Sequence, residues 1–360
     1  MHAPVCVADF ERLAAKRLDE AWLAYFAGGA CDERTLAENV EAFARVRLRP
    51  RVLRDVGSVT TATSALGLEL ALPVLLAPVA YQRHAHPDGE AASARAAAAA
   101  GTAMCVSTLA TATVEEIAAA APGAALLYQV YVFRDRGLTA ELVTRAVAAG
   151  CRALVLTVDV PVVGKREREL RHGWALRAEL VPAFAAALGR DESVLLASLF
   201  DPSVGWEMVD ELRDLTGVPV VVKGLLTAED ALLAAEHGAA AVVVSNHGGR
   251  QLDGVAPALE ALPEVVDAVG GRAEVWLDGG VRRGTDVAKA LALGARVVLA
   301  GRAPLWGLAA AGQEGVEAVL RLLRDELATA LALLGCRSPG ELEAAHVRVP
   351  QPSPGPGRAG

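Results

Sequence analysis

The chain has 360 residues, of which 53% are apolar, 4% aromatic and 22% charged, and its formal net charge is −8 at pH 7. This length fits one α/β barrel of about 250 residues with extensions, or two smaller domains. The acidic balance and the singly scattered basic residues argue against nucleic acid as a partner.

The apolar excess raises the question of a membrane span. The longest uncharged stretches are residues 96–114 and 117–133, close to the ~20 residues that cross a bilayer as a helix. Gly101, Pro122, Gln129 and several Ser and Thr residues interrupt them, so we expect no span. With Asp9 and Glu11 so early and no long apolar stretch, the N-terminus does not fit a signal peptide, and we expect a cytoplasmic protein.

The cysteines give no sign of a disulfide framework or a metal centre. There are five, an odd number, and no two form a CxxC pair. We therefore expect no bound metal.

Residues 9–50 have a charged, amphipathic pattern that predicts a helical extension with Asp9 as its N-cap. From residue 73 onward, eight short apolar runs predict strands, each followed by an Ala-rich helical pattern. The predicted strands are 74–77, 103–106, 124–130, 153–158, 218–222, 240–244, 274–277 and 297–300. The predicted helices are 88–100, 113–121, 138–149, 206–215, 227–237, 256–269, 284–293 and 304–334.

This alternation predicts a (β/α)8 TIM barrel, because continuous apolar strands suit a parallel sheet buried on both faces. A doubly wound sheet would carry a GxGxxG motif after its first strand, and none follows residue 77. We expect one domain over residues 1–349, with the barrel at about 73–334. Residues 160–205 are too long for an ordinary connection and predict a lid, and the Pro/Gly-rich tail 350–360 is expected to be disordered.

Polar groups follow nearly every predicted strand, where TIM barrels place their chemistry. Asp278-Gly279-Gly280 after the seventh strand and Gly301-Arg302 after the eighth offer unobstructed backbone N–H groups. With Arg282 they predict a phosphate-bearing ligand, the alternative being two tight turns.

Lys223 and His247 also follow strands. Lys223 closes an apolar run, and three roles remain open for it: a Schiff base, a structural ion pair, or stabilisation of an anionic cofactor. His247 precedes two glycines and Arg250, a spacing suited to a proton acceptor beside a carboxylate-binding guanidinium. Asp159, at another strand end, is a candidate to orient the His247 ring.

The string Ser245-Asn246-His247-Gly248-Gly249-Arg250-Gln251 is similar to the active-site motif of the FMN-dependent α-hydroxy-acid oxidases and dehydrogenases, the family of glycolate oxidase, lactate oxidase and mandelate dehydrogenase. The resemblance covers about residues 5–345. Further matching segments, in chain order, are 25–30, 77–80, 86–90, 156–159, 222–224 and 277–284.

The resemblance implies that the phosphate-bearing ligand is FMN. It places Lys223 beside the flavin N1 and C2 carbonyl, where it would stabilise the reduced ring. The other implied FMN contacts are Pro78, Val79, Ala80, Ser107, Gln129, Thr157, Ser245, Asp278, Gly279, Gly280, Val281, Arg282, Gly301 and Arg302.

For the substrate, the resemblance implies a carboxylate bound by Arg166 and Arg250, assisted by Tyr25 and Tyr131. Without it, Arg166 would be interpreted as one charge in a solvated run. The implied reaction converts an (S)-2-hydroxy acid to the 2-oxo acid, with His247 as base and O2 reduced to H2O2. A homotetramer is also implied.

Departures from the family pattern bear on the substrate. Leu109 stands where glycolate oxidase has Trp, and Val79 stands where many members have Thr. The smaller Leu109 predicts room for a medium-chain or aromatic acid such as mandelate. Alternatives are a quinone- or cytochrome-linked dehydrogenase of the same family, a non-redox FMN barrel isomerase, and a flavin-binding protein without catalysis.

Overall fold

The computed structural model describes residues 3–173 and 200–349. The predicted disordered tail, 350–360, and most of the predicted lid, 174–199, lie outside these residues.

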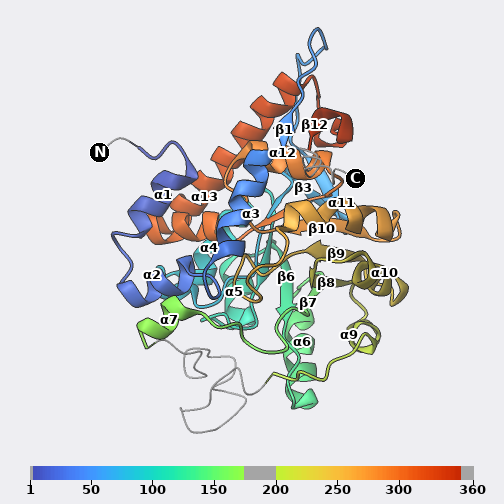
Figure 1. Cartoon of the computed structure of the whole chain (residues 1–360). Coiled ribbons are helices and arrows are strands. Elements are labelled where there is room, and N and C mark those ends of the chain that lie inside the picture. Colours follow the sequence, from blue (N-terminus) through green and yellow to red (C-terminus); the bar gives the residue numbers. More distant parts are fainter. Residues whose placement is uncertain (1–2, 174–199, 350–360) are drawn as a thin grey trace, which may run out of the picture.

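Eight parallel strands close into a barrel with the strand order of the chain, as the sequence predicts, and helices surround it (Figure 1). The strands are β4 (Val74–Leu76), β5 (Ala103–Val106), β6 (Ala125–Val130), β7 (Leu154–Thr157), β8 (Val220–Leu225), β9 (Ala241–Val244), β10 (Glu274–Asp278) and β11 (Val298–Ala300). The surrounding helices are α4 (Gly89–Ala100), α5 (Val114–Ala120), α6 (Arg136–Ala148), α9 (Glu207–Thr216), α10 (Ala228–Glu236), α11 (Ala258–Val269), α12 (Gly284–Ala292) and α13 (Arg302–Leu334). The last strand, β11, pairs in parallel with the first, β4, which completes the closure.

Successive strand residues alternate between two buried clusters. Val220 and Val222 of β8 pack in the larger cluster, which includes residues of the surrounding helices, whereas Val221 packs in a smaller one. The smaller cluster draws on all eight strands and fills the barrel interior. By this alternation Lys223 follows Val221 to the inside, at the carboxyl end of its strand.

The opposite end of the barrel is closed by a hairpin of β2 (Thr63–Ala65) and β3 (Leu68–Leu70). Ala65 and Leu70 belong to the cluster that fills the barrel interior. The Leu66 N–H donates to the Glu274 side chain at 2.9 Å. Ligands therefore have access to the interior from the carboxyl ends of the strands.

The N-terminal extension forms three helices, α1 (Val7–Ala14), α2 (Glu20–Ala27) and α3 (Arg34–Arg45). The predicted N-cap at Asp9 is wrong: α1 begins at Val7, and Asp9 lies in its first turn. Its carboxylate accepts from the N–H groups of Val5 at 2.8 Å and Cys6 at 3.2 Å. An acidic residue three positions after the cap also marks a helix start, which explains the error.

The remaining elements are short. Strand β1 (Arg47–Leu48) pairs antiparallel with β12 (Val347–Arg348), and α7 (Glu167–Arg171) follows β7. The 3-10 helices η1 (Gln82–His84), η4 (Pro339–Glu341) and η5 (Ala344–His346) complete the described elements.

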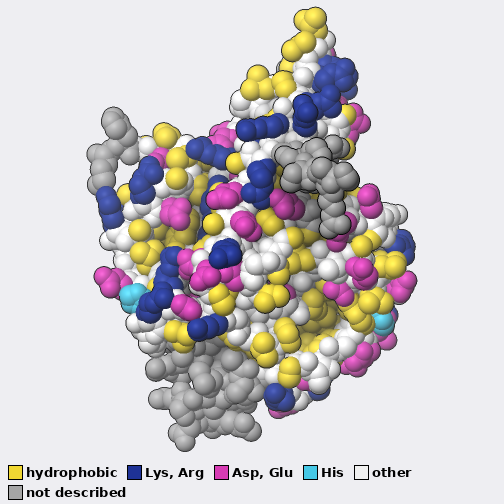
Figure 2. Space-filling view, viewed as in Figure 1, with side chains coloured by type: hydrophobic (Ala, Val, Ile, Leu, Met, Phe, Trp, Pro, Cys, Tyr) yellow, Lys and Arg dark blue, Asp and Glu magenta, His cyan; other side chains and the backbone are white. Residues whose placement is uncertain are grey.

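Among the described helices, none has the length and apolarity that a bilayer crossing requires. Acidic and basic side chains lie among one another over the face shown in Figure 2.

Candidate active site

A cavity of about 130 Å³ opens at the carboxyl ends of the strands. Of the predicted site residues, all but Asp159 and Ser245 line it, and these two contact residues that do. The predicted lining residues are Tyr25, Pro78, Val79, Ala80, Ser107, Gln129, Tyr131, Thr157, Arg166, Lys223, His247, Arg250, Asp278, Gly279, Gly280, Val281, Arg282, Gly301 and Arg302. Segments distant in sequence thus meet in one place.

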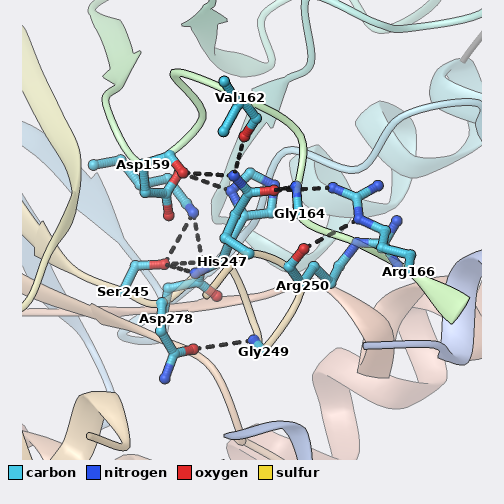
Figure 3. Close-up of polar contacts among 12 residues, drawn as sticks. Asp159, Val162, Gly164, Arg166, Ser245, His247, Gly249, Arg250 and Asp278 are labelled. Atoms are coloured by element: carbon cyan, nitrogen blue, oxygen red, sulfur yellow. Dashed lines mark hydrogen bonds and ion pairs between the residues drawn. The ribbon is translucent and has the colours of Figure 1, made fainter. Parts of the chain in front are cut away.

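His247 and Asp159 are paired at the edge of this cavity. The His247 Nδ1 lies 2.8 Å from Asp159 Oδ1 (Figure 3). The Asp159 carboxylate accepts a hydrogen bond from Nδ1–H, which leaves Nε2 as the proton-accepting nitrogen of a neutral ring. His247 itself has φ 58, a left-handed conformation that side chains rarely adopt, and Gly248 and Gly249 continue it.

The electrostatics of this pair suit a base. Burial lowers the pKa of His247, against the opposing effect of Asp159, so the ring is neutral near pH 7. Burial alone would raise the pKa of Asp159. It is lowered because His247, which is charged in the acidic range where Asp159 titrates, attracts the carboxylate and donates a hydrogen bond to it. A neutral imidazole therefore lies beside an ionised carboxylate.

Lys223 forms a buried ion pair with Asp278, with 2.8 Å between Nζ and Oδ2. Ser245 joins them: its hydroxyl accepts from Lys223 at 3.1 Å and donates to Asp278 at 3.0 Å. Burial would lower the pKa of Lys223, but the carboxylates of Asp278 and Asp159 outweigh it and the pKa is raised. A raised pKa disfavours the Schiff-base role, which needs a neutral amine. The sequence resemblance implied that Asp278 contacts FMN, and although it lines the cavity, its carboxylate is held by Lys223 and Ser245.

Arg166 and Arg250 lie on the other side of the close-up in Figure 3. The Arg166 Nε donates to the Arg250 carbonyl at 3.1 Å, and the Arg250 guanidinium lies 4.7 Å from the centre of the Tyr25 ring. Burial and the charge of Arg250 lower the pKa of Arg166. Two guanidinium groups with aromatic support form a site for a carboxylate, which we call the carboxylate clamp.

Glu169 lies between the two arginines and was not predicted. Its carboxylate is 3.1 Å from Arg250 Nη2 and 3.7 Å from Arg166 Nη1, and the residue is 5% exposed. It offsets part of the repulsion between the two cations. In sequence Glu169 belongs to the run Lys165-Arg166-Glu167-Arg168-Glu169, which looks like a solvated helix face.

The end of the cavity where the sequence predicts a phosphate combines backbone and guanidinium groups. Gly279 and Gly280 have φ 102 and 83, and a Cβ at Gly280 would collide with the Asn39 backbone. Arg302 donates to the carbonyls of Phe26 at 3.0 Å, Gly248 at 2.9 Å and Gly28 at 2.8 Å, so its side chain also joins α2 to the His247 loop.

The cavity fits FMN. Gln129 Nε2 and Thr157 Oγ1 are buried without a hydrogen-bond partner among the described residues, and both residues line the cavity. The carbonyl and ring-nitrogen atoms of a flavin would satisfy an amide donor and a hydroxyl. Burial and the charges of Arg250 and Arg282 lower the pKa of Arg302 to about 9, and a phosphate would relieve this excess of positive charge.

Several apolar lining residues were also absent from the predicted set. Val160, Val163 and Phe200 border the cavity beside Leu109. Phe200 packs on Tyr131, with 4.7 Å between ring centroids. Val160 and Val163 are apolar loop residues a few positions after the end of β7, and no sequence motif marks Phe200.

A TIM barrel whose cavity joins a buried His–Asp pair, two adjacent arginines and a group of glycines and arginines has the features of a flavin-dependent enzyme. The model of the FMN-dependent dehydrogenase family matches residues 14–349, and the chain belongs to this family.

Characterised relatives and solved structures agree with this assignment. The chain is 46% identical to L-lactate oxidase of Nostoc sp. over 360 residues, covering 96% of this chain and 99% of that protein. It is 47% identical to glycolate oxidase of Spinacia oleracea over 350 residues, covering 95% of each. A crystal structure of mandelate oxidase superposes with a TM-score of 0.88 at 47% identity, covering 96% of this chain and 98% of that one. A variant of mandelate oxidase with (S)-mandelic acid also superposes with a TM-score of 0.88, at 45% identity, covering 97% of this chain and 100% of that one.

Proposed function

We propose that this protein is an oxidase that converts an (S)-2-hydroxy acid to the corresponding 2-oxo acid and reduces O2 to H2O2. One observation carries the proposal: His247, oriented by Asp159, shares a cavity with the carboxylate clamp of Arg166 and Arg250. A proton acceptor beside a carboxylate site suits a substrate whose reacting carbon carries a carboxylate. The relatives named above are 2-hydroxy-acid oxidases, which supports the same reaction.

In the proposed complex, the arginines of the clamp bind the substrate carboxylate, and their planar groups fix its orientation. Tyr25 and Tyr131 donate to the substrate carboxylate and hydroxyl. Burial raises the pKa of both tyrosines, so each keeps its phenolic proton at neutral pH. Both side chains can therefore act as donors.

His247 Nε2 accepts the proton that leaves either C2 or its hydroxyl group. Asp159 stabilises the resulting imidazolium through Nδ1. Oxidation removes two electrons and two protons from the substrate, and O2 takes up both pairs as H2O2. FMN, when bound, would supply the two-electron redox chemistry that links the substrate to O2.

The residues proposed to hold FMN form three groups. Pro78, Val79 and Ala80 would border the flavin edge, and Ser107, Gln129, Thr157, Lys223 and Ser245 would contact or support the ring. The ribityl chain and phosphate would lie along Asp278, Gly279, Gly280, Val281, Arg282, Gly301 and Arg302, which offer backbone N–H groups and two guanidinium groups.

The proposed substrate class is a medium-chain or aromatic 2-hydroxy acid, such as (S)-mandelate. Leu109, Val160, Val163 and Phe200 give the cavity an apolar wall. Such a wall favours an apolar side chain over the bare hydrogen of glycolate.

We also propose that residues 1–349 act as one domain, that the protein is cytoplasmic, and that it assembles as a homotetramer. The cytoplasmic location is supported by the five cysteines, which are all free, as suits a reducing compartment. Val52 and Leu53, 80% and 104% exposed, offer apolar contacts for a second copy. Light scattering of the purified holoenzyme would measure the assembly.

The reaction is tested by adding (S)-mandelate to the holoenzyme without oxygen. We expect the visible absorption of the flavin to bleach, benzoylformate to form, and O2 to restore the absorption with release of H2O2. Persistence of the oxidised spectrum with mandelate, 2-hydroxyoctanoate, lactate and glycolate would refute the proposed function.

A further inference from the structure

Gln251, which follows the clamp residue Arg250, uses both ends of its side-chain amide. Its Nε2 donates to the carbonyls of Asp159 at 2.7 Å and Val162 at 2.8 Å. Its Oε1 accepts from the Gly164 N–H at 3.1 Å and from Arg166 Nη2 at 3.3 Å. If the amide were rotated by 180°, its oxygen would face two carbonyl oxygens and its NH2 group would face two N–H donors. The four partners therefore determine the orientation of the Gln251 amide.

These contacts join two segments that are far apart in sequence. The segment after β7 carries Asp159 and Arg166, and the segment after β9 carries His247 and Arg250. The acid–base pair and the carboxylate clamp are therefore each divided between the same two segments. Figure 3 shows both pairs with the contacts that connect them.

The two segments are also in close backbone contact. A Cβ on Gly164 would lie 2.5 Å from the Gln251 carbonyl oxygen and 2.8 Å from that of Arg250. The Gln251 amide itself contacts the segment after β7 at two separate points, the Asp159 carbonyl and the Arg166 guanidinium. Displacement of this segment would move Asp159 relative to His247 and Arg166 relative to Arg250.

This matters because the carboxylate and the reacting carbon of a 2-hydroxy acid are one bond apart. A proton acceptor and a clamp that serve both groups must keep a fixed separation, and errors of about 1 Å can cost about 100-fold in rate. We propose that Gln251 is a positioning residue that maintains the separation between His247 and the carboxylate clamp. The proposal rests on the proposed function.

The test compares Gln251→Leu, which removes all four contacts, and Gln251→Glu, which turns an oxygen toward the carbonyls of Asp159 and Val162. The control is Gln313→Leu in α13. Gln313 also has a bridging amide, accepting from Arg95 at 2.7 Å and donating to Glu317 at 2.8 Å, but it does not line the cavity.

Two quantities are measured on each holoenzyme: the rate of anaerobic flavin reduction at saturating (S)-mandelate, and the Kd of oxalate, a non-reacting carboxylate, from the change in flavin absorption. For both Gln251 variants we expect the rate to fall about 100-fold and the oxalate Kd to rise about tenfold. FMN content and Tm should stay near those of the wild type, and Gln313→Leu should change neither quantity by more than about twofold.

A positioning role is refuted if a Gln251 variant with full FMN content keeps both quantities within about twofold of the wild type. It is also refuted if both variants lose FMN or unfold, because the role is then structural. Reduction of the wild type by mandelate tests the proposed function separately, and the oxalate titration tests Gln251 without turnover.

Discussion

His247 and Asp159, 88 positions apart in the chain, meet through a 2.8 Å contact between Nδ1 and Oδ1. The contact directs the protonated nitrogen to the carboxylate and leaves the other nitrogen of the neutral ring as the acceptor. It also places a negative charge where an imidazolium would form. The relationship between these two residues therefore accounts for both the orientation and the basicity of the proposed base.

Replacing His247 by Gln should abolish flavin reduction by substrate while leaving FMN bound. The amide cannot accept a full proton, and loss of a general base costs about 10²–10⁴-fold in rate. Stopped-flow measurement of anaerobic reduction by (S)-mandelate checks this, with FMN content measured in parallel. Rapid reduction in the variant would remove His247 from the role of base.

A second histidine–aspartate pair provides the control. His237 Nδ1 lies 2.5 Å from Asp210 Oδ2, but neither residue lines the cavity. His237→Gln should therefore reduce flavin at the wild-type rate.

The pH dependence of kcat/KM should show an acidic limb below pH 6.5, the ordinary pKa of histidine, because burial lowers the pKa of His247. A base works only when it is deprotonated. Activity therefore falls as the pH drops through the pKa of His247, and the enzyme is fully active above that pKa. The Asp159→Asn substitution removes the charge that raises the pKa of His247, so the acidic limb should move to still lower pH. The maximal kcat/KM should also fall, because the imidazolium loses its stabilising carboxylate. A limb that stayed fixed or moved to higher pH would contradict this assignment.

The barrel and much of the cavity lining could be predicted because each rests on short-range sequence features. The apolar runs of strands buried on both faces end at polar groups such as Lys223 and His247, and parallel closure brings those ends together. Lys223 shows the limit of this reasoning. The local sequence left three roles open for it, and only the family resemblance chose among them. Its ion pair with Asp278 joins side chains of β8 and β10, two strands that β9 separates in the barrel.

The residues that were missed act through tertiary contacts alone. In the sequence Glu169 resembles a solvated charge, but in the structure α7 places its carboxylate between Arg166 and Arg250. Phe200 follows a long insertion, and its packing on Tyr131 has no local signal. The error at Asp9 is of another kind. The sequence correctly indicated a helix start there, but Asp9 lies in the first turn of α1 and is not its N-cap.

Arg166→Lys should weaken substrate binding although it keeps the charge. A lysine cannot present two parallel N–H groups to a carboxylate and would lose the contact to the Arg250 carbonyl. The loss of about 1.5–3 kcal/mol for a charged hydrogen bond predicts that KM and the oxalate Kd rise about 10–150-fold. Arg168→Lys, beside it and paired with Glu33, is the control and should leave both unchanged. Equal effects of the two substitutions would argue against a specific clamp at Arg166.

Leu109→Trp should shift the substrate preference toward small acids. Leu109 is 5% exposed and lines the cavity, so an indole there must occupy space that a substrate side chain would use. Because each methylene contact is worth about 1–3 kcal/mol, kcat/KM for mandelate and 2-hydroxyoctanoate should fall about 10–200-fold relative to glycolate. Leu170→Trp on α7, where Leu170 is 59% exposed, is the matched control and should leave the ratios unchanged. A uniform fall for all three acids would show that Leu109 supports the fold of the site and does not select the side chain.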